Sequence, residues 1–169
     1  MEKNKRIIIG IDPGSRFTGY GIICIEGQQQ NAVAFGTIAT PQTALNEKLY
    51  FIYQHLCELI TLHKPDEAAI EQIFTCLNMQ SALKLGQARG AALTATAALA
   101  LPIVEYSARQ IKKAVTGYGA ADKMQIQHMV RALLRLTETP KEDAADALAI
   151  AICHANHRRF QNAVEREKI

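Results

Sequence analysis

Residues 6–15 read RIIIGIDPGS, an almost continuous apolar run that stops at an aspartate followed by Pro-Gly. The isoleucines would fill both faces of a strand, which is typical of a strand covered on two sides. Asp12 therefore stands at the end of a buried strand, where a carboxylate stays charged only with a partner. Asp-Pro-Gly is also ordinary turn chemistry, because proline fixes its φ and glycine accepts a positive φ. Alone, the tripeptide favours a turn, so any further role of Asp12 depends on the rest of the chain.

The composition around this stretch is that of one soluble domain. The chain has 169 residues, 49% of them hydrophobic and 21% charged, with a net charge of +3. That charge permits a polyanionic partner without requiring one. No window reaches the ~20 apolar residues of a membrane span, so we expect a cytoplasmic protein with no membrane contact. We predict one domain over residues 1–158 and a flexible C-terminal tail over 159–169.

The expected elements change from a run of strands to an alternation of strands and helices. The strands are predicted over 6–11, 18–27, 31–40, 67–74 and 102–107, and the helices from residue 45 and over 81–101, 108–115, 122–136 and 142–156. The short spacing of the first three strands predicts an antiparallel meander. The whole pattern predicts an α/β fold in which a five-stranded mixed sheet is flanked by helices.

Three further acidic residues are poorly explained by a solvated surface. Glu71 lies among apolar residues in the fourth strand, although an edge strand facing water would explain it equally well. Asp143 and Asp146 are three residues apart and share one face of the last helix, although the dipole of the helix N-terminus would by itself explain Asp143. Its N-terminus reads as a capping box formed by Thr139 and Glu142, with Pro140 at the first helical position. If the first and fourth strands are parallel neighbours, Asp12 and Glu71 would converge.

Clustered carboxylates predict a site for hard metal ions. Like charges in a dry site raise one another's pKa, so such a cluster stays ionised only with cations. Ligands that are all oxygen favour Mg²⁺ or Mn²⁺ over zinc. Two such ions about 3.5–4 Å apart activate a water and stabilise the leaving oxygen of a phosphodiester. The acids therefore predict phosphoryl-transfer chemistry.

Several long blocks of the sequence carry a family resemblance. In order they are GIDPGSRFTGYG (10–21), AIEQIF (69–74), SALKLGQARGAA (81–92), EYSARQIKKAVTGYG (105–119), DKMQIQHMVRALL (122–134) and EDAADALAIAICH (142–154). Together they resemble the RuvC family of Holliday-junction resolvases over nearly the whole chain. The resemblance implies an RNase H-like fold of the retroviral-integrase superfamily and a homodimer. It also implies paired nicking of four-way DNA junctions with two Mg²⁺ per subunit, for which Mn²⁺ can substitute, and coupling to the RuvA–RuvB branch-migration complex.

The resemblance also assigns roles to residues. The catalytic, metal-binding acids fall on Asp12, Glu71, Asp143 and Asp146. Lys112 and Lys123 correspond to residues near the scissile phosphate, and Phe74 to an aromatic that stacks on an unpaired base at the junction centre. Further DNA contacts are expected from Arg89, Arg109 and Lys113. Related chains often carry Lys or Arg where this one has Leu77, which puts a phosphate contact from that loop in doubt.

Simpler interpretations of these residues remain open. A basic helix face is most often only solvated, and Phe74 would pack equally well in a core. An actin-like or sugar-kinase-like ATPase also opens with a strand, an aspartate and a glycine-rich hairpin, but it needs a second domain. A DNA-binding module without catalysis would not need four intact acids. Two symmetric nicks require two sites, so we expect the helix over 81–101 to form a dimer interface through Ala82, Gly86 and Gly90, the alternative being a helix buried inside the monomer.

Overall fold

The first half of the sheet is the predicted meander. The computed structural model describes residues 5–72 and 78–166. Strands β1 (Lys5–Asp12), β2 (Phe17–Glu26) and β3 (Gln29–Ala39) pair in turn as antiparallel neighbours. The antiparallel pairing of these strands confirms the meander.

The second half of the sheet is parallel. Strand β4 (Glu67–Glu71) pairs with β1, and β5 (Ile103–Tyr106) pairs with β4, both in parallel. The strand order is β3-β2-β1-β4-β5, so β1 lies at the centre with β2 on one side and β4 on the other. Asp66 fixes the start of the β1/β4 pair, because its carboxylate accepts a hydrogen bond from the amide of Ile7 at 2.7 Å and its own amide donates to the carbonyl oxygen of Ile7 at 2.8 Å. The predicted five-stranded mixed sheet is therefore confirmed.

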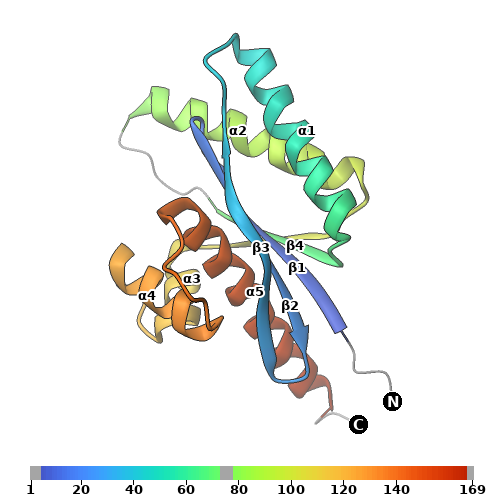
Figure 1. Ribbon diagram of the computed structural model, residues 1–169, viewed down its shortest axis with the longest axis vertical. Helices are drawn as coiled ribbons and strands as arrows, with labels where there is room; N and C mark the ends of the chain where they lie inside the picture. The colour runs from blue at the N-terminus through green and yellow to red at the C-terminus, as the bar shows by residue number, and fades with distance from the viewer. Residues whose placement is uncertain (1–4, 73–77, 167–169) are drawn as a thin grey trace.

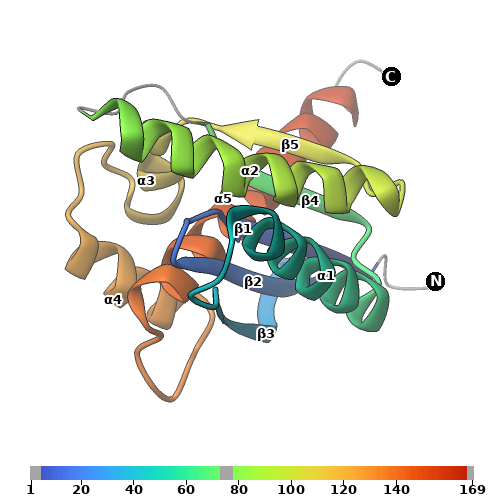
Figure 2. The ribbon, with the colours of Figure 1, turned by 90° about the horizontal axis from the view of Figure 1, so that it is seen from above.

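Helices cover both faces of this sheet (Figures 1 and 2). Helices α1 (Leu45–His63) and α2 (Met79–Ala98) lie together on one face. The opposite face carries α3 (Ala108–Thr116), α4 (Lys123–Leu133) and α5 (Glu142–Arg166). Side chains of β1 alternate between the two cores, since Ile8 packs with the α5 layer and Ile9 with the α1 layer. This two-sided burial is what the isoleucine run predicted.

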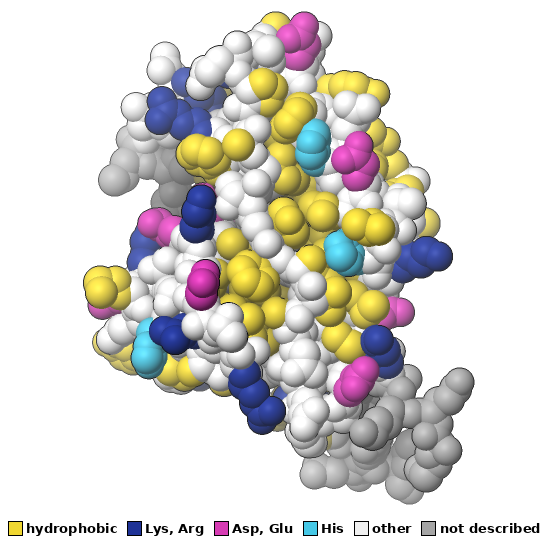
Figure 3. All heavy atoms as spheres, in the orientation of Figure 1, with side chains coloured by type: hydrophobic (Ala, Val, Ile, Leu, Met, Phe, Trp, Pro, Cys, Tyr) yellow, Lys and Arg dark blue, Asp and Glu magenta, His cyan; other side chains and the backbone are white. Residues whose placement is uncertain are grey.

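Strand β3 forms one open edge of the sheet. Its pairing with β2 shifts by one residue after Ala32, which leaves Val33 as a β-bulge. Residues 27–46 contain no Asp, Glu, Lys or Arg, and Val33 and Phe35 are exposed. A hollow of about 370 Å³ lies beside this edge, between β3 and α1. Figure 3 shows apolar side chains gathered across this face of the molecule.

The start of α5 differs from the sequence-based expectation. The helix begins at Glu142, so Thr139 and Pro140 precede it and the predicted capping box is wrong. The Pro140 carbonyl instead accepts a hydrogen bond from the Gln127 side chain of α4 at 3.1 Å, which holds this segment outside the helix. At its other end α5 continues to Arg166, and the flexible tail over 159–169 stays a prediction.

Helix α2 is buried on only one side within the monomer. Ala88, Ala92, Ala95 and Thr96 are buried, whereas Gly86 and Gly90 are exposed. A methyl group built on either glycine would meet nothing within 4 Å. The alternative of a helix buried all round inside the monomer is therefore wrong. In the part of the chain that the structure describes, no helix is both long and apolar enough to span a membrane.

Candidate active site

Two of the predicted acids end neighbouring strands. Asp12 is the last residue of β1 and Glu71 the last residue of β4. These strands are parallel and hydrogen-bonded, with Ile11 opposite Ile70, so both carboxylates lie at the same edge of the sheet. Both side chains are half-buried. The aspartate that ends the isoleucine strand is thus placed beside a second acid by the register of the pair.

Glycines on β1 and β2 allow α5 to bring the other two acids to this edge. A Cβ on Gly19 would lie 2.1 Å from the carbonyl oxygen of Asp143, and one on Gly10 would lie 2.1 Å from that of Ala147. Gly19 is the register partner of Asp12. Because these glycines have no side chains, the sheet has a shallow groove here, and the first two turns of α5 lie directly on the sheet backbone in it. Asp143 reaches the end of β1 only because this groove exists.

The pKa of Asp12 is affected by burial and by the charges of the other three acids. The pKa of Asp12 is raised from 3.8 to about 8, first by burial and then by the charges of neighbouring carboxylates. These neighbours are Asp146, Glu71 and Asp143. Burial also raises the pKa of Glu71 and the pKa of Asp146. Such a set of carboxylates is stabilised by a cation, which is consistent with the donor chemistry of a hard divalent ion.

The acids lie near one another, but they are not arranged as the ligands of a metal ion. Among the described residues, no group of three or more His, Cys, Asp or Glu side chains is arranged closely enough to hold a metal ion. Their donor atoms are all carboxylate oxygens, which suits Mg²⁺ or Mn²⁺. Ion binding would therefore require these side chains to draw together at the edge of the sheet.

Two lysines border the acids across a cleft of about 250 Å³. Glu71, Asp146, Lys112 and Lys123 line it, together with apolar residues of α3, α4 and α5. Ser107 caps α3 and Asp122 caps α4, each with a complete capping box, which fixes the helix ends that carry these lysines. Lys112 lowers the pKa of Glu71, and Lys123 lowers the pKa of Asp146, against the larger effect of burial. The cleft thus combines anionic and cationic walls.

The remaining predicted contacts lie in different surroundings. Arg109 and Lys113 are exposed on α3. Arg89 of α2 forms an ion pair with Glu105 at 2.7 Å and reaches the backbone oxygen of Glu71 at 3.5 Å, so it supports the strand end behind that acid. Phe74 and Leu77 lie outside the described residues. A DNA contact from any of these residues stays a prediction.

Comparison with known proteins identifies the family. The family model described as crossover junction endodeoxyribonuclease RuvC matches residues 8–154. The chain belongs to the RuvC family. A RuvC of Coxiella burnetii is 61% identical over 168 residues, covering 99% of this chain and 98% of that protein. A RuvC of Shewanella frigidimarina is 56% identical over 148 residues, covering 88% of this chain and 86% of that protein.

A solved structure shares the fold. The structure of Thermus thermophilus RuvC in complex with a Holliday-junction substrate matches with a TM-score of 0.87 at 33% identity. The match covers 92% of this chain and 96% of the Thermus chain. The RNase H-like fold and the family resemblance predicted for this RuvC chain are therefore confirmed.

Sequence reasoning missed two features of this RuvC site. The first is the glycine groove, although Gly19 and Gly21 alternate along β2 and so point to one face of the sheet. A Cβ on Gly21 would lie 2.6 Å from the amide nitrogen of Leu148 on α5. The second is the ion pair between Lys123 and Glu142, which places a further carboxylate beside a lysine of the cleft. Spacing alone assigned Glu142 to a cap, so its pairing with α4 could not be foreseen.

Proposed function

We propose that this chain resolves four-way DNA junctions by paired, symmetric nicking, as its family membership suggests. The observation that carries the proposal is a cleft in a RuvC chain that is lined by two carboxylates and two lysines, beside a third carboxylate, that of Asp12, whose pKa is raised by burial and by neighbouring acids. The Thermus relative, solved with a Holliday-junction substrate, supports this DNA structure as the substrate. This activity would serve homologous recombination and DNA repair in the cytoplasm.

Asp12, Glu71, Asp143 and Asp146 are proposed to hold two Mg²⁺ per subunit, with Mn²⁺ able to substitute. When bound, the ions would supply an activated water and stabilise the leaving oxygen of the phosphodiester. The chain's own contribution is to bring acids from β1, β4 and α5 to one edge of the sheet. The raised pKa of Asp12 supports the proposal, because a buried carboxylate among carboxylates is stabilised by cations.

Lys112 and Lys123 are proposed to bind the scissile phosphate. Both line the cleft that contains Glu71 and Asp146. Lys123 is paired with Glu142, and it must share or exchange this partner when a phosphate oxygen arrives. Because an exposed ion pair contributes only about 0–1 kcal/mol, this exchange costs little.

A homodimer is proposed because one site can make only one of two symmetric nicks. The exposed face of α2 supports an interface there, since Gly86 and Gly90 leave room for the close approach of a second helix. Ala82 is half-exposed near the start of the same helix. The RuvA–RuvB complex is proposed as a partner on the family resemblance alone.

The decisive experiment incubates the pure protein with synthetic four-way junctions and with linear duplex, with and without Mg²⁺. We expect paired nicks in the junction only, and only with Mg²⁺. Replacing any of the acids, as in Asp146→Asn, should abolish incision while junction binding persists in Ca²⁺, whose longer and looser coordination misplaces the water.

Glu138→Gln is the matched control, because Glu138 is an exposed acid in the segment before α5. This variant should cleave like the wild-type protein. Cleavage at the wild-type rate by Asp146→Asn would rule out the proposed site, and cleavage of linear duplex at the rate of the junction would rule out the proposed substrate.

A further inference from the structure

Strand β4 and helix α5 face each other at two places. Glu67 and Glu71 are four residues apart on β4, so both side chains point to the face that carries α5. On α5, His154 follows Asp146 by eight residues, which places it about two turns further along the helix. Four strand residues span about 13 Å and eight helix residues rise about 12 Å. The two elements therefore match in length, with Asp146 toward Glu71 and His154 toward Glu67.

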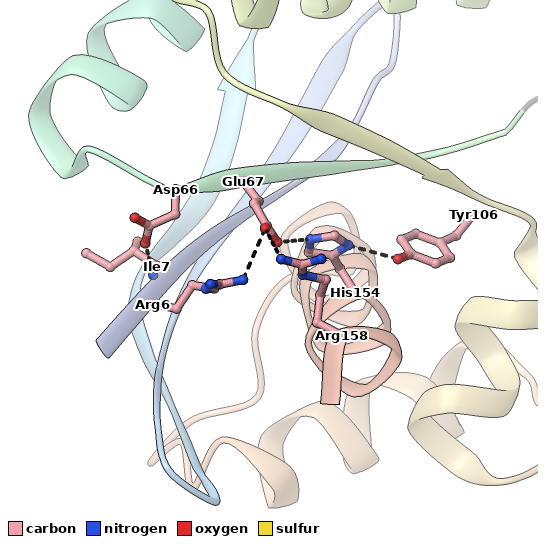
Figure 4. Close-up of polar contacts among 7 residues, drawn as sticks. All are labelled: Arg6, Ile7, Asp66, Glu67, Tyr106, His154 and Arg158. Atoms are coloured by element: carbon pink, nitrogen blue, oxygen red, sulfur yellow. Dashed lines mark hydrogen bonds and ion pairs between the residues drawn. The ribbon is translucent and has the colours of Figure 1, made fainter. Parts of the chain in front are cut away.

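The contact between His154 and Glu67 is buried and directional. His154 is 1% exposed, and its Nε2 lies 2.6 Å from Oε2 of Glu67. Its Nδ1 lies 2.8 Å from the hydroxyl of Tyr106 at the end of β5. Figure 4 shows the imidazole held between these two side chains. Both ring nitrogens are thus used, and the side chain has one orientation.

The charges around Glu67 determine which atoms donate. Arg158 lies 2.9 Å and Arg6 lies 3.2 Å from Oε1 of Glu67, and a carboxylate held between two guanidinium groups accepts hydrogen bonds. Nε2 of His154 therefore carries the hydrogen and donates a hydrogen bond to Glu67. Burial lowers the pKa of His154 and so favours the neutral ring, in which Nδ1 accepts from the Tyr106 hydroxyl when Nε2 donates to Glu67.

We propose that the hydrogen bond from His154 to Glu67 sets the axial register of α5 along β4, and that both are positioning residues for the acids at the other end. This inference rests on the metal site proposed above. Asp146 and Glu71 are both anionic and repel each other, so their own interaction does not fix the helix at the separation that the ions require. The bond two turns further along α5 supplies that constraint.

The same network reaches the other wall of the cleft. The backbone oxygen of Tyr106 accepts a hydrogen bond from the amide of Gln72 at 2.8 Å, and Tyr106 is the register partner of Glu71. The next residue, Ser107, caps the helix that carries Lys112. A change at His154 would therefore be transmitted both to the acids of α5 and to the end of β4. Misplacing reacting groups by about 1 Å costs on the order of 100-fold in rate.

Two substitutions of His154 separate the two hydrogen bonds. In His154→Gln the amide nitrogen lies close to the position of Nε2 and keeps the bond to Glu67. In His154→Asn the shorter amide lies close to Nδ1, so it keeps a partner for Tyr106 and loses Glu67. We expect His154→Gln to stay within about 3-fold of the wild-type incision rate and His154→Asn to lose at least about 10-fold in kcat.

Two further readouts distinguish positioning from folding. Direct Mn²⁺ titration of the protein alone should show weaker binding by His154→Asn than by His154→Gln, whereas junction binding without metal should be unchanged in both. Incision is measured well below the melting temperature of each variant. The register proposal would be overturned if the two variants had the same kcat and the same Mn²⁺ affinity, whether both stayed at the wild-type values or both fell below them.

Two controls complete the test. If His154→Asn does not fold, Glu67→Ala decides, because it removes the same bond from the other side and should weaken Mn²⁺ binding in the same way. Wild-type Mn²⁺ affinity in Glu67→Ala would overturn the proposal. Asp146→Asn, measured in parallel, distinguishes a failure of the proposed metal site from a failure of the register proposal. If Asp146→Asn still cleaves, the metal site is wrong. If it is inactive while the two His154 variants cleave at equal rates, only the register proposal is wrong.

Discussion

Asp12 is the residue at which burial and like charge act together. Its pKa of about 8 means that the folded protein retains a proton on this carboxyl at pH values where the unfolded chain has lost it. The unfolded state therefore binds fewer protons between about pH 4 and 8, and the free energy of unfolding falls as pH rises through this window. A cation bound by the acids would oppose this loss, because it favours the ionised form.

A pH dependence of stability follows for the metal-free protein. With EDTA present, we expect Asp12 alone to lower the melting temperature from pH 5 to pH 7 by up to about 3–5 °C per pH unit, because one proton contributes at most about 1.4 kcal/mol per unit. Asp12→Asn should flatten this slope and raise stability at pH 7, although it abolishes incision. Thermal denaturation followed by circular dichroism measures both. Parallel curves for the two proteins would show that Asp12 does not carry the raised pKa.

The residues also show how far the sequence could be interpreted. The acids were recognisable because strand ends and helix spacing place Asp12, Glu71 and Asp146 by local rules. The start of α5 was missed because the Pro140 carbonyl bonds to Gln127 of α4, a contact between elements that no local pattern reveals. The pairing of His154 with Glu67 joins residues 87 positions apart and is equally invisible to periodicity.

At the scale of elements, the contact between α5 and the sheet depends on small residues. Periodicity predicted every strand and helix approximately, but it did not predict that α5 would lie so close to β1 and β2. That approach requires glycine on the sheet side, since an added Cβ at Gly19 would overlap the backbone of Asp143. The groove therefore links packing directly to the position of a proposed metal ligand.

Gly19→Ala tests this link. The new methyl group must displace α5 or β2, so we expect a loss of about 1–3 kcal/mol in the free energy of unfolding. Incision should fall by at least about 10-fold because Asp143 moves with the helix backbone. Chemical denaturation and junction-cleavage rates measure the two effects.

Gly36→Ala is the matched control for this substitution. It changes a strand glycine of the same sheet, but its methyl group would meet the terminal hydroxyl of Tyr20 rather than backbone. It should retain incision. A Gly19→Ala protein that cleaves at the wild-type rate would show that the groove does not position the site.

At the scale of the whole molecule, the two faces of the sheet have different tasks. The face that carries α5 holds the acids, whereas the face that carries α1 and α2 presents the exposed glycines of α2. Sequence reasoning predicted an apolar helix over 81–101, but only the structure separates its buried alanines from its exposed glycines. Tertiary packing, not composition, determines which residues of an alanine-rich helix are buried in the core and which are exposed.

Gly90→Glu tests the proposed interface of the dimer. A side chain at Gly90 meets no atom of its own chain within 4 Å, so the variant should still fold. We expect light scattering to show a dimer for the wild-type protein and a monomer for this variant, because a charge would be buried without a partner. Thr61→Glu, which adds the same charge on the exposed face of α1, should remain dimeric. A Gly90→Glu dimer would place the interface elsewhere.

The open edge of β3 has a consequence for the behaviour of the protein in concentrated solution. Natural sheets usually protect their edge strands with charges, and residues 27–46 contain none. The bulge at Val33 interrupts the regular ladder there, and it limits how many backbone hydrogen bonds a second strand can form. Crowded molecules would therefore associate edge to edge through short, reversible pairings. Colloidal solubility, rather than unfolding, would then set the upper limit on the concentration at which this enzyme can be handled.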